Sequence, residues 1–356
     1  MPGIPENQKE RIEEQKRRRG IPGYEILGVL GSGAMAKVYK GRQLNLNRIV
    51  AIKVLPSRLA KNKGYVERFH KEGQAAAKLN HPNIVSAIDV GQAGKYHYFV
   101  MEYVEGETID ALLKKGKIFD EKDALEIIIQ VARALQHAHK QGLIHRDVKP
   151  KNIMITNEGV VKLADMGLAR ELTDIDTIEA EKGQAWGTPY YIAPEQIRGK
   201  MDVDGRADIY SLGATLYHMV TGKVPFFHED KANVMKMHLY KSLIPPDYIN
   251  KKLSIGISEM IEIMMKKNPK DRYPDAKLLI EDIESLLTGD PPFRVHQSID
   301  VDSFSQLASG DFVPAEKIPA DWEREIERYR IAVLVLAAAV VVFIITIIAL
   351  IVLLVK

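Results

Sequence analysis

One segment of this sequence cannot belong to the core of an ordinary soluble domain. Residues Ile331–Val355 contain no charged side chain, and Thr346 is their only polar residue. A helix of this length reaches roughly 37 Å and crosses a hydrocarbon core of about 30 Å with some tilt. Amphipathic helices of soluble domains keep a polar face, which this segment lacks. The sequence therefore predicts a transmembrane helix over residues 331–355, with the rest of the chain on one side of a membrane.

The charges beside this segment predict its orientation. Arg324, Arg328 and Arg330 precede it, whereas Lys356 alone follows it, and basic flanks remain on the cytoplasmic side. Residues 1–20 are rich in charge and lack the apolar stretch of a signal peptide. We therefore expect the bulk of the chain in the cytoplasm.

Two segments without regular periodicity enclose a folded unit. Residues 1–23 carry many charges of both signs and are expected to form a mobile charged tail. Residues 289–330 have scattered polar residues and several prolines, which is typical of a juxtamembrane linker. The folded domain is thus predicted over residues 24–288.

Charge and cysteine content exclude several classes of protein. Basic residues exceed acidic ones by only 50 − 47 = 3, so we expect no nucleic-acid partner. The absence of cysteine excludes a disulfide scaffold, a cysteine-ligated metal and a cysteine nucleophile. The domain must therefore be held by its own hydrophobic core, which a chain of 356 residues can bury.

The pattern of apolar residues changes along the folded unit. Its first part has β-branched and aromatic runs bounded by Gly or Asn, which predict strands over 24–30, 37–44, 49–55, 85–90 and 96–103. One helix is expected among them, over Asn62–Leu79. Helical patterns dominate from Asp120 onward. Asp120 itself is a suitable N-cap for a helix that ends before Gly142. The prediction is an α+β fold with a small β-rich lobe, a larger helical lobe and a ligand cleft between them.

The first lobe contains two features suited to phosphate binding. Gly31-Ser32-Gly33 lies between two strands, where glycine lets the backbone approach phosphate oxygens. Alone this is a weak signal, because Gly-Ser-Gly is also an ordinary hairpin turn. Lys53 lies in an apolar strand and needs a counter-charge, which Glu72 on the expected helix can supply.

The second lobe carries a stronger signal, His145-Arg146-Asp147-Val148-Lys149-Pro150-Lys151-Asn152. Asp147 can accept a hydroxyl proton, and Lys149 can contact a transferring phosphate. Asn152 and Asp165, which follows a strand predicted over 160–163, offer hard oxygen ligands suited to Mg²⁺.

Together with Ala193-Pro194-Glu195, these motifs occur in an order that resembles the protein kinases. The resemblance covers about three quarters of the chain, residues 24–287. Asp-Val-Lys-Pro-Lys-Asn and Gly187-Thr188-Pro189 resemble the serine/threonine branch. With the predicted membrane helix, the chain resembles the bacterial eukaryotic-like (Hanks-type) membrane serine/threonine kinases, which implies a bilobal protein-kinase fold at a bacterial inner membrane.

The resemblance implies roles for particular residues, with ATP and Mg²⁺ as cofactors and proteins with Ser/Thr acceptors as substrates. Asp147 and Lys149 would be catalytic, and Asn152 and Asp165 would hold the metal. ATP would be bound by Leu30, Gly31, Ser32, Gly33, Val38, Ala51, Lys53, Glu72, Glu102 and Val104. Thr188, Asp208 and the pair Glu195–Arg272 would be structural. Two departures from the family pattern, Ala36 for a loop glycine and Met166 for a phenylalanine, remove no group that contacts phosphate or metal.

The resemblance also suggests control by phosphorylation. Arg146 resembles a sensor for an activation-loop phosphate, for which Thr177 is the first candidate and Thr173 the second. The alternative is constitutive activity, with Glu179 or Glu181 supplying a carboxylate to Arg146.

Three functions fit these motifs. An active protein serine/threonine kinase is favoured over a pseudokinase scaffold, because Lys53, Asp147 and Asp165 are all present. A small-molecule kinase is disfavoured, since such enzymes lack the full segment that ends at Ala-Pro-Glu. Self-association stays open, because the apolar segment has no Gly-xxx-Gly motif.

Overall fold

The computed structural model of this protein describes residues 20–33, 36–165, 189–200 and 202–292. The predicted tail up to residue 19, the linker beyond residue 292 and the apolar segment 331–355 lie outside these ranges. Within them, no helix is both long and apolar enough to cross a membrane.

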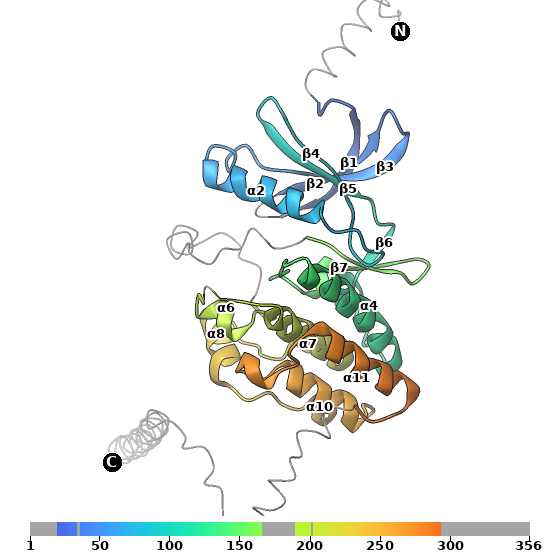
Figure 1. Ribbon diagram of the computed structural model, residues 1–356, viewed down its shortest axis with the longest axis vertical. Helices are drawn as coiled ribbons and strands as arrows, with labels where there is room; N and C mark the ends of the chain where they lie inside the picture. Colours follow the sequence, from blue (N-terminus) through green and yellow to red (C-terminus); the bar gives the residue numbers. More distant parts are fainter. Residues whose placement is uncertain (1–19, 34–35, 166–188, 201, 293–356) are drawn as a thin grey trace, which may run out of the picture. The chain divides into compact units, whose positions relative to one another are not determined.

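A five-stranded antiparallel sheet forms the first lobe (Figure 1), with strand order β1-β2-β3-β5-β4. The runs of β-branched and aromatic residues predicted all five strands, and their ends differ from the prediction by at most a few residues. The strands are β1 (Tyr24–Ser32), β2 (Lys37–Gln43), β3 (Arg48–Val54), β4 (Ala87–Ala93) and β5 (Tyr96–Glu102).

The helix of this lobe, α2 (Lys63–Ala76), covers one face of the sheet (Figure 1). Asn62 is its N-cap and accepts a hydrogen bond from the Gly64 N–H at 2.9 Å. Phe69 and Ala76 are buried in a cluster with Phe99 of β5. The helix ends before Leu79, which the sequence analysis had included in it. Leu79 instead packs in the core of the second lobe.

The other face of the sheet has its own small core, formed by Val50, Ile52, Tyr98, Val100 and Ile21. Ile21 is 7% exposed, although the sequence analysis placed it in the mobile tail. The folded unit therefore begins a few residues earlier than predicted.

The second lobe is mainly helical and contains the largest hydrophobic cluster. Asp120 is the N-cap of its helix α4 and accepts from the Asp123 N–H at 2.8 Å, as predicted. The helices are α3 (Ile109–Lys114), α4 (Glu121–Lys140), α6 (Pro194–Ile197), α7 (Arg206–Thr221), α8 (Lys231–Tyr240), α9 (Pro246–Ile249), α10 (Ile255–Met264) and α11 (Ala276–Thr288), with short 3₁₀ turns at Pro150–Asn152 and Pro269–Asp271. The bilobal α+β prediction is confirmed.

A three-stranded sheet packs against the core of the second lobe, with order β6 (Gly106–Thr108), β7 (Ile153–Thr156) and β8 (Val161–Leu163). Leu163 of β8 donates to the Asn83 carbonyl at 2.8 Å, and its own carbonyl accepts from the Val85 N–H at 3.0 Å. The sequence analysis predicted β8 but not β6 or β7. Because β8 is joined to the segment before β4, residues that follow β8 are held close to the first lobe.

Candidate active site

Lys53 joins residues of the two lobes. On β3 it lies opposite Phe99 of β5, and the two-residue period of a strand points it to the face covered by α2. Its Nζ donates to Glu72 Oε1 at 2.7 Å, which confirms the predicted pair, and to Asp165 Oδ1 at 3.0 Å. The second contact joins Lys53 to a residue 112 positions later, and sequence patterns gave no signal for it.

The charges of this cluster depend on one another. Burial opposes the charge of Lys53, but the carboxylates of Asp165 and Glu72 outweigh it and raise the pKa of the lysine. The Lys53 ammonium lowers the pKa of Asp165. Burial raises the pKa of Glu72, and Lys53 counters this effect. We conclude that Lys53 stays protonated and Asp165 ionised at neutral pH.

A buried carboxylate, that of Asp208, holds the start of the loop from His145 to Asn152. Asp208 of α7 accepts the N–H groups of His145 at 2.8 Å and of Arg146 at 2.7 Å, and His139 Nε2 contacts it at 2.8 Å. Arg146 has a φ of 63°, a left-handed conformation that costs a non-glycine residue about 1–2 kcal/mol. Two hydrogen bonds to one buried carboxylate offset that cost, so Asp208 holds this loop in place.

His145 fixes the end of β8 relative to this loop. Its Nδ1 accepts from the Asp147 N–H at 3.2 Å, so the neutral ring carries its proton on Nε2. Nε2 lies 3.0 Å from the Ala164 carbonyl and donates to it. The buried imidazole thus orients the loop and the residue before Asp165.

Two polar side chains converge on Asp147. Lys149 Nζ donates to Asp147 Oδ2 at 2.6 Å, and Asn152 Nδ2 donates to the same oxygen at 3.1 Å. The Asn152 carbonyl accepts from the Ala164 N–H at 2.8 Å, which holds Asn152 beside the strand end that leads to Asp165. Since the amide nitrogen of Asn152 faces Asp147, its amide oxygen is the atom suited to a metal.

The glycine turn and the residues expected around adenine lie on neighbouring strands. Gly31 pairs with Val38, and the register places Val38 opposite Lys53. Apart from Gly31 and its two chain neighbours, no described residue has an atom within 4 Å of a Cβ built on Gly31, so the space beside this backbone is open. Ala34 and Met35 lie outside the described residues. Ala51 pairs with Met101, directly before Glu102.

Glu102 makes a contact that the sequence analysis did not predict. Lys162 Nζ of β8 lies 2.8 Å from Glu102 Oε1 and 3.0 Å from Oε2, and the Ser86 N–H donates to Oε2 at 3.2 Å. Lys162 precedes Asp165 by three residues. An ion pair therefore joins the end of β5 to the strand that positions Asp165.

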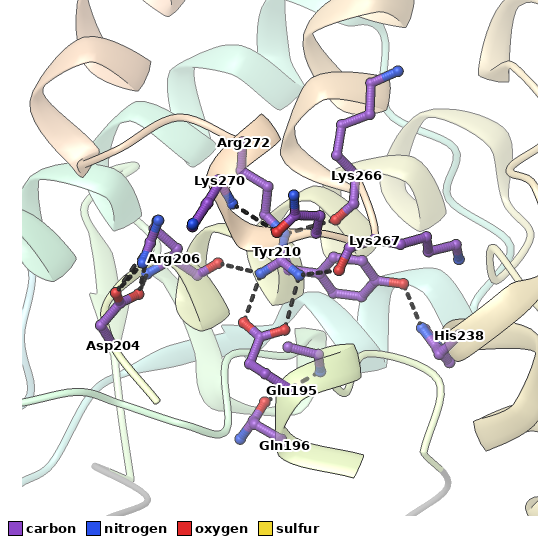
Figure 2. A network of polar contacts seen from close by, with 12 residues as sticks. Glu195, Gln196, Asp204, Arg206, Tyr210, His238, Lys266, Lys267, Lys270 and Arg272 are labelled. Carbon is purple, nitrogen blue, oxygen red and sulfur yellow. Dashed lines mark hydrogen bonds and ion pairs between the residues drawn. The ribbon is translucent and has the colours of Figure 1, made fainter. Parts of the chain in front are cut away.

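A second predicted pair, formed by Glu195 of α6 and Arg272, is buried (Figure 2). Arg272 Nη1 and Nη2 donate to the two carboxylate oxygens at 2.7 and 2.8 Å. The carbonyls of Lys266, Arg206 and Lys267 accept the other N–H groups at 2.7, 2.9 and 3.1 Å. All five guanidinium donors are thus used, and this structural pair is confirmed.

The structure describes only one of the residues expected to control activity, Arg146. Thr173, Thr177, Thr188, Glu179 and Glu181 lie outside the described residues, as does Met166. Arg146 is described, and its carbonyl accepts from Gln196 Nε2 of α6 at 2.9 Å. The backbone of Arg146 is therefore tied to the start of the helix that follows the Thr188 region.

Comparisons with known proteins agree with this geometry. The profile of the protein kinase domain matches residues 24–282. Probable serine/threonine-protein kinase CPE1738 of Clostridium perfringens is 42% identical over 293 residues, which cover 82% of this chain and 42% of that protein. Serine/threonine-protein kinase PknB of Mycobacterium leprae is 38% identical over 291 residues, which cover 81% of this chain and 46% of that protein.

A solved structure supports the same fold. The crystal structure of the Mycobacterium tuberculosis PknI kinase domain matches with a TM-score of 0.59 and 28% identity, over 75% of this chain and 97% of that one. The present chain spans less than half the length of the two curated relatives, at 42% and 46% of their sequences.

Proposed function

Because this chain belongs to the protein kinase family, we propose that it is an ATP-dependent serine/threonine protein kinase. It would transfer the γ-phosphoryl group of ATP, in the presence of Mg²⁺, to serine and threonine hydroxyls of proteins. The relatives named above, both called serine/threonine-protein kinases, support the choice of acceptor.

One observation carries the proposal: the Lys53 ammonium contacts both Glu72 and Asp165, at 2.7 and 3.0 Å. A cation is thus held by one carboxylate of the first lobe and one carboxylate that follows β8. Phosphoryl transfer depends on positioning and on neutralising phosphate charge. A fixed cation beside a potential metal ligand meets both needs.

The donors present fit MgATP. Asp165 and Asn152 supply carboxylate and amide oxygens, which Mg²⁺ prefers, and the backbone of Gly31, Ser32 and Gly33 would face the phosphates. Leu30, Val38 and Ala51 would pack against adenine, whose edge would meet the backbone from Glu102 to Val104. When bound, MgATP supplies the phosphoryl group and the positive charge of the metal. Lys53 orients phosphate oxygens, and Glu72 keeps Lys53 in place.

Asp147 is the residue suited to the acceptor hydroxyl. Its Oδ2 accepts from Lys149 and Asn152 at 2.6 and 3.1 Å, which fixes the carboxylate. Asp147 would orient the hydroxyl and accept its proton. The Lys149 ammonium at this carboxylate would also stabilise negative charge on the phosphoryl group.

The proposal is tested by incubating the purified chain with γ-labelled ATP, Mg²⁺ and a general protein substrate. Label is expected on phosphoserine and phosphothreonine, and Asp147→Asn is expected to reduce incorporation at least about 10²-fold. Asp123→Asn, an exposed aspartate of α4, is the matched control and should leave the rate unchanged. No transfer by the native chain would favour a pseudokinase, and labelling of small molecules alone would favour a small-molecule kinase.

We also propose that residues 331–355 anchor the chain in a bacterial inner membrane with the kinase domain in the cytoplasm. The uncharged segment and its basic flank support this placement, and the two relatives come from bacteria.

Deletion of residues 331–356 is expected to move the kinase from washed membranes to the soluble fraction, because the apolar segment would be its anchor. Immunoblots of the two fractions measure this, and phosphotransfer by the released protein serves as a control for folding. If the shortened chain stayed in washed membranes, the anchor would lie elsewhere.

A further inference from the structure

A cavity of about 340 Å³ lies on the second lobe, apart from every residue assigned above to the active site. It is lined by His81, Arg133, Gln136, His137, Lys140 and Ile280. None of these lining residues carries a carboxylate, and five of them carry N–H groups in their side chains. The cavity therefore presents donors and positive charge.

The helix period places four of these donor residues on one face of α4. Arg133, Gln136, His137 and Lys140 follow the spacing i, i+3, i+4, i+7, which places them on one helix face. The opposite face of α4 is buried in the core. Helix α11 packs beside α4 (Figure 1) and contributes Ile280. His81 comes from the loop between α2 and β4.

His81 has a defined proton position. Its Nδ1 accepts from the Asn83 N–H at 3.1 Å, so the neutral ring carries its proton on Nε2 and can donate there. The ring centroids of His81 and His137 are 5.3 Å apart. Burial lowers the pKa of His81, and His137, Arg133 and Lys162 lower it further. The surroundings of His81 are thus rich in positive charge and favour an anion.

One carboxylate lies nearby and must be considered. Glu284 of α11 accepts from Arg133 Nη2 at 2.9 Å, and the two side chains are 52% and 48% exposed. Exposed pairs of this kind contribute at most about 1 kcal/mol. The bond involves one of the five N–H groups of the guanidinium. Arg133 can therefore bind a second anion without losing Glu284.

We propose that this cavity binds a phosphate monoester dianion. Arg133 and Lys140 would supply the charge, while the Nε2–H of His81 and the amide of Gln136 would donate hydrogen bonds to its oxygens. A volume of about 340 Å³ is near the lower end of ligand sites, which suits a phosphorylated side chain or free phosphate. This site is independent of the proposed transfer reaction.

Binding should change the titration of His81 in a predictable direction. A dianion beside the ring favours imidazolium, so it raises the pKa that burial, His137, Arg133 and Lys162 lower. By linkage, the affinity for the dianion increases as pH falls toward 7.

The experiment uses the full chain, labelled with ¹³C at histidine and saturated with Mg²⁺ and a non-hydrolysable ATP analogue to occupy the nucleotide site. Inorganic phosphate and N-acetyl-phosphothreonine amide are titrated in separate arms, with acetate as the control anion. Saturable shifts of the His81 and His137 Cε1–H signals are expected, with a higher pKa for His81. Tighter binding of phosphothreonine would indicate a phosphoprotein ligand, and equal binding would indicate free phosphate; either result supports the site.

The variant Arg133→Gln with Lys140→Gln is expected to weaken phosphate binding at least about tenfold, because two charged donors are lost. Lys122→Gln with Lys277→Gln removes the same charge from exposed positions of α4 and α11 and should change binding by less than about twofold. Both variants should keep native phosphotransfer. Unchanged binding in the first variant, the absence of His81 shifts or equal shifts with acetate would overturn the proposal.

Discussion

Replacing Lys53 by methionine is expected to reduce phosphoryl transfer at least about 10²-fold, the effect of losing one preorganised electrostatic contact in an active site. Methionine fills a similar volume but supplies no charge. Glu72 and Asp165 would then face each other without the cation that joins them at 2.7 and 3.0 Å. The rate of γ-phosphate transfer to a protein substrate measures the loss.

Folding should survive this substitution, because the neighbouring carboxylate can change its protonation. Burial already raises the pKa of Glu72, and without Lys53 the pKa would rise further, so Glu72 would take up a proton. Lys95→Met, an exposed lysine between β4 and β5, is the matched control. A Lys53→Met protein that melts like the native chain yet keeps more than about a tenth of its activity would contradict the role given to Lys53.

Arg272→Ala is expected to lower the free energy of unfolding by about 3–5 kcal/mol. Arg272 is 1% exposed, and its loss leaves the Glu195 carboxylate, 4% exposed, without its cation (Figure 2). Three backbone carbonyls would lose a donor in the same place. Urea unfolding followed by circular dichroism measures the change.

The matched control is Arg133→Ala, which removes an arginine from an exposed pair of the same lobe. Its cost should be no more than about 1 kcal/mol. A loss of similar size for both substitutions would mean that burial of the Glu195–Arg272 pair has no special effect on stability.

Features that repeat along the chain could be predicted from the sequence. Alternating and β-branched runs gave the strands of the first lobe, and Asp120 gave the start of α4. The apolar strand around Lys53 and the expected helix gave the pair Lys53–Glu72, and the family resemblance gave the pair Glu195–Arg272. The short strands β6 and β7 were missed. The sequence of β6, Gly-Glu-Thr, has no apolar run, and β7 directly follows the motif that ends at Asn152.

Contacts between distant side chains could not be predicted in the same way. Lys162 and Glu102 are 60 residues apart. Glu102 was expected only at the nucleotide, and Lys162 was assigned no partner. His139 was assigned no role, because helix spacing shows which face it occupies but not that Asp208 lies there. Such pairs depend on how β8 and α7 pack in three dimensions, which local periodicity does not encode.

The position of Asp208 limits which residues evolution could accept there. One carboxylate receives two consecutive main-chain N–H groups and an imidazole, and it is 0% exposed. Asparagine has one acceptor oxygen and would turn an NH₂ group toward a donor, while glutamate adds a methylene to a site without spare volume. Any substitution at position 208 would therefore need compensating changes at His139 and in the backbone at His145 and Arg146. Single substitutions of Asp208 are thus expected to disrupt the loop.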